Sequence, residues 1–115
     1  MILWLAGLLG CSYLYEVRVT TILPPDAAGA LVLTLTDFTP AIPETRRVAI
    51  EPTIRVHETS FEVCCAPDPK VSVTAFIDAN DNGTQDPEEH AWVHPTITLT
   101  ERIQSMLINF ASHPR

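Results

Sequence analysis

The segment Val71-Ser-Val-Thr-Ala-Phe-Ile77 decides the fold, and Asp78-Ala-Asn-Asp-Asn-Gly83 follows it directly. Its apolar side chains recur at every second residue, which is the period of a β-strand with one buried face. Prolines at positions 67 and 69 and the Asn/Asp/Gly-rich stretch 78–89 bound it with turn chemistry. The sequence therefore predicts a half-buried strand that leads straight into an acidic loop.

The same period of two recurs along most of the chain. Tyr15, Val17 and Val19 alternate with polar residues, and no stretch carries a sustained helical stripe. Further strands are expected at 31–36, 48–50, 54–57, 61–65, 91–93, 96–100 and 106–110. Short strands at this spacing, separated by proline-rich and Asn/Gly-rich turns, predict an all-β fold, an antiparallel β-sandwich of about seven to eight strands.

Length and charge narrow the possible functions. A chain of 115 residues with 46% hydrophobic side chains can build one core, so a single domain is expected. Seven basic against 14 acidic residues give a net charge of -7, which argues against nucleic-acid binding and favours cations as small partners. No apolar run reaches the roughly 18 residues that span a bilayer.

The N-terminal residues 1–10 carry no charge and end in small residues before Cys11, as a signal peptide does. Leu8-Leu9-Gly10-Cys11 resembles the lipobox of bacterial lipoproteins, in which the cysteine thiol receives a diacylglycerol. The resemblance implies a lipoprotein-type signal peptide at 1–10, a domain at 11–115, and attachment to a membrane surface through lipidated Cys11. An uncleaved anchor and a buried first segment with Cys11 in the core are the alternatives.

The loop 78–89 matches the calcium-loop pattern D-x-[DN]-x-[DN]-G-x5-E. Ca²⁺ prefers six to eight oxygen ligands, and short side chains at alternate loop positions converge on one point. Gly83 permits the sharp turn that such a loop needs. The expected metal ligands are Asp78, Asn80, Asn82, Thr84 through its carbonyl, Asp86 and Glu89. The alternative interpretation is a solvated acidic turn that joins two strands.

The flanks of the loop argue against a helix-loop-helix calcium sensor. A strand enters the loop, and Asp86-Pro87-Glu88-Glu89 resembles a capped single turn with proline at its first position. A calcium ion in such a loop would act as a structural clip and not as a conformational switch.

The strand 73–77 with Asp78-Ala-Asn-Asp-Asn-Gly83 resembles small exported bacterial sandwich domains of the prealbumin-like (transthyretin-like) type. The resemblance implies an immunoglobulin-like or prealbumin-like sandwich that binds or scaffolds and does not catalyse. It covers about a quarter of the chain.

The remaining reactive residues do not assemble an enzyme motif. Alternation places Cys65 on the apolar face of its strand and Cys64 on the polar face, so one core cysteine and one exposed thiol are expected, with a disulfide as the alternative. His90 and His94 are expected to be exposed, with Trp92 between them in the core. No nucleophile, phosphate-loop or zinc-protease signature occurs, and no catalytic residue is expected.

These observations predict a cell-envelope accessory or binding module, lipid-anchored, periplasmic or at the cell surface, with a structural Ca²⁺ in the 78–89 loop. An envelope protein or a glycan would be its partner. The alternative is a metal-independent protein- or carbohydrate-binding sandwich that uses the acidic loop itself as its recognition surface. The response to a chelator separates the two functions.

Overall fold

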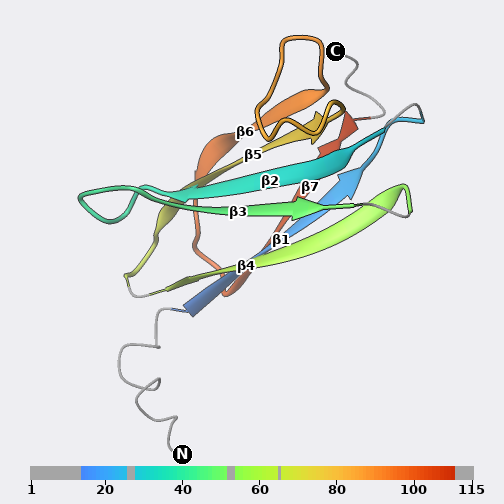
Figure 1. Ribbon diagram of the computed structural model, residues 1–115. Helices are drawn as coiled ribbons and strands as arrows, with labels where there is room; N and C mark the ends of the chain where they lie inside the picture. The colour runs from blue at the N-terminus through green and yellow to red at the C-terminus, as the bar shows by residue number, and fades with distance from the viewer. Residues whose placement is uncertain (1–13, 26–27, 52–53, 65, 111–115) are drawn as a thin grey trace, which may run out of the picture.

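The computed structural model describes residues 14–25, 28–51, 54–64 and 66–110. In chain order the strands are β1 (Leu14–Ile22), β2 (Ala30–Asp37), β3 (Glu44–Ile50), β4 (Val56–Cys64), β5 (Lys70–Asp78), β6 (Ala91–Thr98) and β7 (Ile103–Asn109). Figure 1 shows them as two layers of strands with the 78–89 loop at one end of the molecule. The all-β fold predicted from the sequence is confirmed.

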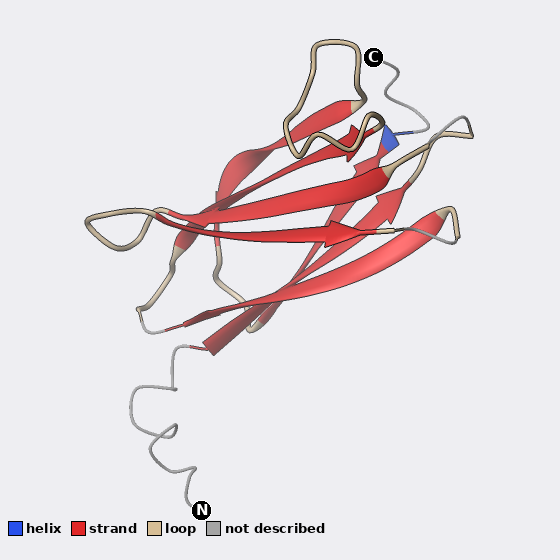
Figure 2. Cartoon of the chain, in the orientation of Figure 1, coloured by secondary structure: helices blue, strands red, loops and turns tan. Residues whose placement is uncertain are grey.

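The strands form two sheets, a three-stranded sheet with the order β4-β1-β7 and a four-stranded sheet with the order β3-β2-β5-β6 (Figure 2). All strand pairs among the described residues are antiparallel except β1 with β7, which is parallel. Residue alternation predicts which face of a strand is buried but not its direction. The chain crosses from the four-stranded to the three-stranded sheet after β6, and β7 then lies beside β1 and runs parallel to it.

The core lies between the two sheets and is made of the alternating side chains that the sequence indicates. Val17 and Val19 of β1, Leu33 of β2 and Val71 and Val73 of β5 are completely buried. Burying a Val or Leu side chain contributes about 1.5–3 kcal/mol relative to leaving it exposed. These contacts fix the sandwich, and the loops at its ends are positioned by it.

Two pairs of short predicted strands are each one strand in the structure. The expected strands at 54–57 and 61–65 form β4, and those at 91–93 and 96–100 form β6. β6 continues across Pro95 because it is an edge strand, where a missing N–H need not break a ladder. Its pairing with β5 shifts register between Val71 and Val73.

Three predictions concern residues outside the described ranges. This applies to the signal peptide at 1–10, to lipidation of Cys11 and to the placement of Cys65. Within the described part of the chain, no helix is long and apolar enough to cross a bilayer.

Candidate functional site

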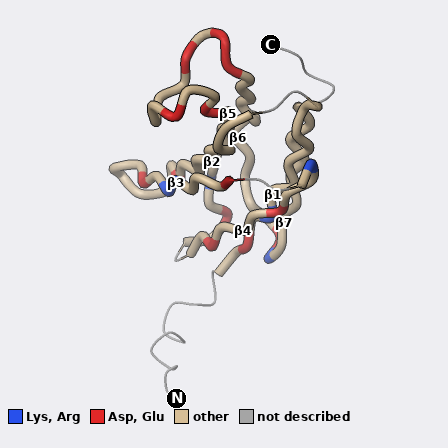
Figure 3. The backbone as a smooth tube through the Cα atoms, turned by 45° about the vertical axis from the view of Figure 1, so that its right-hand side comes forward, with Lys and Arg blue, Asp and Glu red and all other residues tan. Residues whose placement is uncertain are grey.

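The loop 78–89 joins β5 to β6 at one end of the four-stranded sheet. Asp and Glu residues follow one another along it, and Figure 3 shows this concentration of acidic positions beyond the end of the sheet. The residues that the sequence selects as ligands are connected to one another by hydrogen bonds within this loop.

Asp78 begins the loop and organises its first half. The residue is only 3% exposed, because it is the last residue of the buried strand β5. Its Oδ2 accepts a hydrogen bond from the N–H of Gly83 at 2.7 Å, and its Oδ1 accepts one from the N–H of Asn82 at 3.2 Å. Gly83 has φ of 76°, a conformation that favours glycine. One carboxylate therefore folds the Asn-Asp-Asn-Gly segment around itself.

Asp86 is the point on which the two asparagine side chains converge. The amide nitrogens of Asn80 and Asn82 both donate to Asp86 Oδ2, the second over 3.0 Å. Asn82 also accepts a hydrogen bond from the N–H of Thr84 through its Oδ1, at 2.9 Å. The third, fifth and ninth positions of the loop therefore lie side by side.

Glu89 closes the loop onto its beginning. Its Oε2 accepts a hydrogen bond from the N–H of Ala79 at 2.8 Å, and its Oε1 accepts one from the N–H of Asp86 at 2.9 Å. The N–H of Glu89 donates in turn to the carbonyl of Asp86 at 3.0 Å. The bond from the Asp86 N–H to the Glu89 side chain is one half of a capping box, and the bond between the two backbones closes a turn, so the predicted single turn at 86–89 is present.

Two contacts fix the loop to the sandwich. Arg47 of β3 donates to the carbonyl of Gly83, and its guanidinium lies 5.7 Å from the centre of the Phe76 ring. Gly29 approaches the loop from the start of β2, and a Cβ at this position would lie 2.2 Å from the carbonyl oxygen of Asp78. Neither contact is visible in the sequence pattern, because both partners are remote from the loop along the chain.

The donor set of the loop fits a hard cation. The loop contains the carboxylates of Asp78, Asp86 and Glu89 and the side-chain amides of Asn80 and Asn82, which are oxygen ligands of the kind Ca²⁺ uses, and its hydrogen bonds join Asn80, Asn82 and Glu89 to Asp86. Rotating the Asn80 amide by half a turn presents its oxygen where its nitrogen now lies. Within the described residues no three His, Cys, Asp or Glu side chains are arranged so that they could hold a metal ion.

Thr84 differs from the other expected ligands in its role. It enters the network through its N–H, which donates to Asn82, and the structure assigns no contact to its carbonyl. The carbonyl next to it, that of Gly83, accepts the Arg47 guanidinium.

Trp92 and His94 lie on one face of β6, and His90 directly precedes this strand. Trp92 and His94 pair with Ala75 and Val73, whose side chains are buried in the core. Both histidines are half-buried, and the rings of His90 and Trp92 meet the buried Phe110 edge-on at centroid distances of 6.2 and 6.4 Å. The expectation that the histidines are exposed is therefore wrong, whereas Trp92 packs against the core as predicted. The register of β6 with β5 places positions 92 and 94 on the inner face, and the contact with Phe110 covers His90.

Cys64 is exposed at the end of β4, as alternation predicts, but it is disulfide-bonded and not a free thiol. The chain contains two other cysteines, Cys11 and Cys65, and both lie outside the described residues. Strand periodicity indicates which face a cysteine occupies, and it gives no information about its oxidation state.

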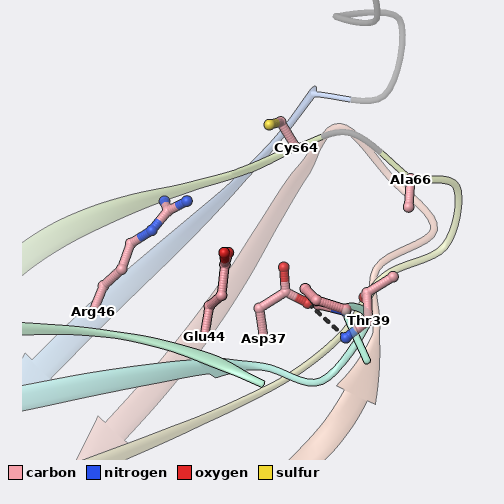
Figure 4. Close-up of a pocket in the computed structure, with 7 residues that line it drawn as sticks. Asp37, Thr39, Glu44, Arg46, Cys64 and Ala66 are labelled. Carbon is pink, nitrogen blue, oxygen red and sulfur yellow. Dashed lines mark hydrogen bonds between the residues drawn. The ribbon is translucent and has the colours of Figure 1, made fainter. Parts of the chain in front are cut away.

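A cavity of about 500 Å³ lies at the opposite end of the four-stranded sheet, and the sequence reasoning missed it (Figure 4). Asp37, Glu44 and Arg46 line it. A signal was present in the sequence, because Asp37 continues the apolar alternation of Leu33 and Leu35 with a charged residue.

Compared with protein-family models, with curated proteins and with solved structures, the chain matches none.

Proposed function

We propose that this chain is an exported, prealbumin-like β-sandwich module of the bacterial cell envelope, anchored to a membrane surface through lipidated Cys11, whose 78–89 loop binds calcium. It serves an envelope protein or a glycan as an accessory or binding module and carries out no reaction. The observation that supports the calcium proposal is the set of hydrogen bonds that joins four of the six expected ligand positions, those of Asn80, Asn82 and Glu89 to that of Asp86.

The electrostatics of the loop support a cation at this place. Asp78, Asp86 and Glu89 lie within twelve residues of one another, and the loop also contains Asp81 and Glu88. Carboxylates this close repel one another, and a divalent cation removes the repulsion while it cross-links the two halves of the loop. Asp78, Asn80, Asn82, Asp86 and Glu89 would hold the ion through side-chain oxygens.

The support around the loop favours a structural role for the ion. A rigid strand enters the loop, Arg47 holds its tip on β3, and Gly29 packs against its first peptide group. A switch needs an element with two packed arrangements, whereas this loop continues a buried strand. Calcium here would raise the stability of one end of the sandwich.

A melt of the full chain with calcium, with magnesium and with a chelator tests the proposal. Extracellular modules bind calcium with dissociation constants of roughly 0.1–1 mM, so about 10 mM Ca²⁺ is expected to stabilise the fold by about 1.4–2.7 kcal/mol. The rise in Tm should grow with calcium concentration and exceed that with magnesium. Identical melts in all three solutions would contradict calcium binding and favour the metal-independent recognition loop.

A matched pair of variants separates ligation from loop charge. Asp86→Asn removes a carboxylate on which two side chains converge, whereas Asp81→Asn removes the same charge from the same loop at a non-ligand position. Asn tolerates the positive φ of 58° at position 81. We expect the calcium-dependent rise in Tm to disappear in Asp86→Asn and to persist in Asp81→Asn. Equal losses would indicate nonspecific screening of the loop.

The lipid anchor is tested by the fate of Cys11. A cysteine that carries a thioether-linked lipid cannot also form a disulfide, so lipidation requires that Cys64 be paired with Cys65. Mass spectrometry of the chain recovered from bacterial membranes is expected to show a diacylglycerol on Cys11. A disulfide between Cys64 and Cys11 would exclude the anchor and leave the calcium proposal untouched.

A further inference from the structure

The cavity at the end of β2 and β3 lies between the edge strands of the two sheets. Asp37 of β2 and Glu44 and Arg46 of β3 line it from the four-stranded sheet, and Cys64 at the end of β4 lines it from the three-stranded sheet. Its volume of about 500 Å³ falls in the range of small-molecule sites. In Figure 4 the side chains of Asp37, Glu44 and Arg46 extend from one sheet toward the other.

The strand register shows that these three charges belong to the inner face of the sandwich. Glu44 is opposite Asp37 in the antiparallel pair of β2 and β3, and Arg46 is opposite the completely buried Leu35. Residues opposite one another share a face, so all three lie on the face that carries the core. Arg46 donates a hydrogen bond to the carbonyl of Glu62 in β4, which directs its guanidinium across the gap between the sheets.

The two carboxylates of the cavity lack a counter-ion in the described part of the chain. Asp37 is only 8% exposed; its Oδ1 accepts the N–H of Thr39 at 2.9 Å, and no described residue donates to its Oδ2. Glu44 accepts no hydrogen bond from a described residue, and no nitrogen of Arg46 lies within 4.0 Å of either carboxylate. Like charges directly opposite on a sheet destabilise it, so this pair has an energetic reason to attract a cation.

We propose that this cavity binds a small zwitterion of dipeptide size, with its ammonium group at Asp37 and Glu44 and its carboxylate at Arg46. A guanidinium held by one hydrogen bond keeps further N–H donors for a carboxylate, which it binds in a planar, bidentate geometry. The apolar parts of Pro40 and Ala66 complete the wall and suit a small aliphatic side chain. The proposal involves neither the calcium loop nor the lipid anchor.

The test is a titration of the full chain by NMR or calorimetry with L-alanyl-L-leucine and two blocked forms. The N-acetylated dipeptide lacks the ammonium group, and the dipeptide amide lacks the carboxylate. Each lost charged contact is expected to weaken binding about tenfold or more. Saturable binding of the free dipeptide together with weaker binding of both blocked forms supports the proposal.

Variants place the ligand in the cavity. Glu44→Gln and Arg46→Gln should each weaken dipeptide binding about tenfold or more, because each removes one charged contact. Glu58→Gln is the matched control, since Glu58 is exposed on β4 and does not line the cavity. Thermal melts of the variants verify that they fold. No saturable binding of alanyl-leucine up to about 10 mM, or equal effects of all three variants, would overturn the proposal and leave the inward charges as protection of an edge strand.

Discussion

The acidic loop and the charged cavity, at opposite ends of the four-stranded sheet, use the same residue types in different ways. In the loop, Asp78 and Glu89 each accept two backbone N–H groups, so the chain itself satisfies their oxygens. In the cavity, Asp37 accepts one N–H, and Glu44 accepts none from the described residues. In the loop, nearby backbone donors hold in place the carboxylates that a cation would share, whereas in the cavity the carboxylates keep oxygens to which no described residue donates.

The difference follows from sequence separation. The donors that serve Asp78 and Glu89 lie within ten residues of them, so the loop folds as a local unit. The cavity collects its lining from β2, β3 and the end of β4. Its electrostatics therefore depend on how the two sheets come together.

The largest effect is expected from Gly29→Ala, which breaks the loop without touching the cavity. The new Cβ would lie 2.2 Å from the backbone oxygen of Asp78, and the position has φ of 110°. Strain and overpacking together should destabilise the fold by about 2–4 kcal/mol, measured by urea denaturation. A loss below about 0.5 kcal/mol would mean that the start of β2 does not support the loop.

Asp78→Ala compared with Asp37→Ala tests the contrast directly. The first leaves two backbone N–H groups without their acceptor and should cost about 1–3 kcal/mol of unfolding free energy. The second removes one acceptor but also relieves the repulsion with Glu44, and it should cost less by about 1 kcal/mol. Equal losses in urea denaturation would contradict the division of roles.

Arg47→Gln is expected to have a smaller effect that is confined to the loop. It removes the hydrogen bond to the Gly83 carbonyl and the contact with the Phe76 ring, which together stabilise by about 0.5–1.5 kcal/mol. Amide hydrogen exchange should accelerate at 82–84 and remain unchanged at Thr39. Arg46→Gln is the control, because Arg46 is next to Arg47 on β3 but faces the cavity and not the loop. Faster exchange at both ends in either variant would indicate that the two regions are coupled.

The smallest effect is expected at Glu16, whose carboxylate forms an ion pair with Arg18. Hydrogen bonds from Arg18 and Ser60 hold the pKa of Glu16 below its usual value of 4.5. Because the pKa is lower in the folded state, this contribution to stability is present above the unfolded pKa and is lost as the pH falls through the folded one. Glu16→Gln should slightly flatten the fall of Tm below about pH 4.5. Identical pH profiles of variant and parent would show that the pair is fully screened.

The sequence by itself determined the features that depend on neighbouring residues. The period of two at 71–77 fixed a strand with Val71 and Val73 buried, and the spacing of Asp78, Asn82 and Asp86 fixed which side chains meet in the loop. Both patterns act over a few residues, where backbone geometry leaves little choice. Two pairs of short segments were expected as separate strands where each pair forms one strand, because a proline or a polar residue inside a strand resembles a strand end.

Only the tertiary structure decided what depends on the packing of remote strands. The parallel course of β7 and the inward position of His90 and Trp92 both follow from contacts between segments that are remote along the chain. The cavity belongs to the same class, since Glu44 becomes the neighbour of Asp37 only through the register of β2 with β3. Side-chain periodicity specifies a face of a strand, whereas the partner opposite that face is chosen when the two sheets pack together.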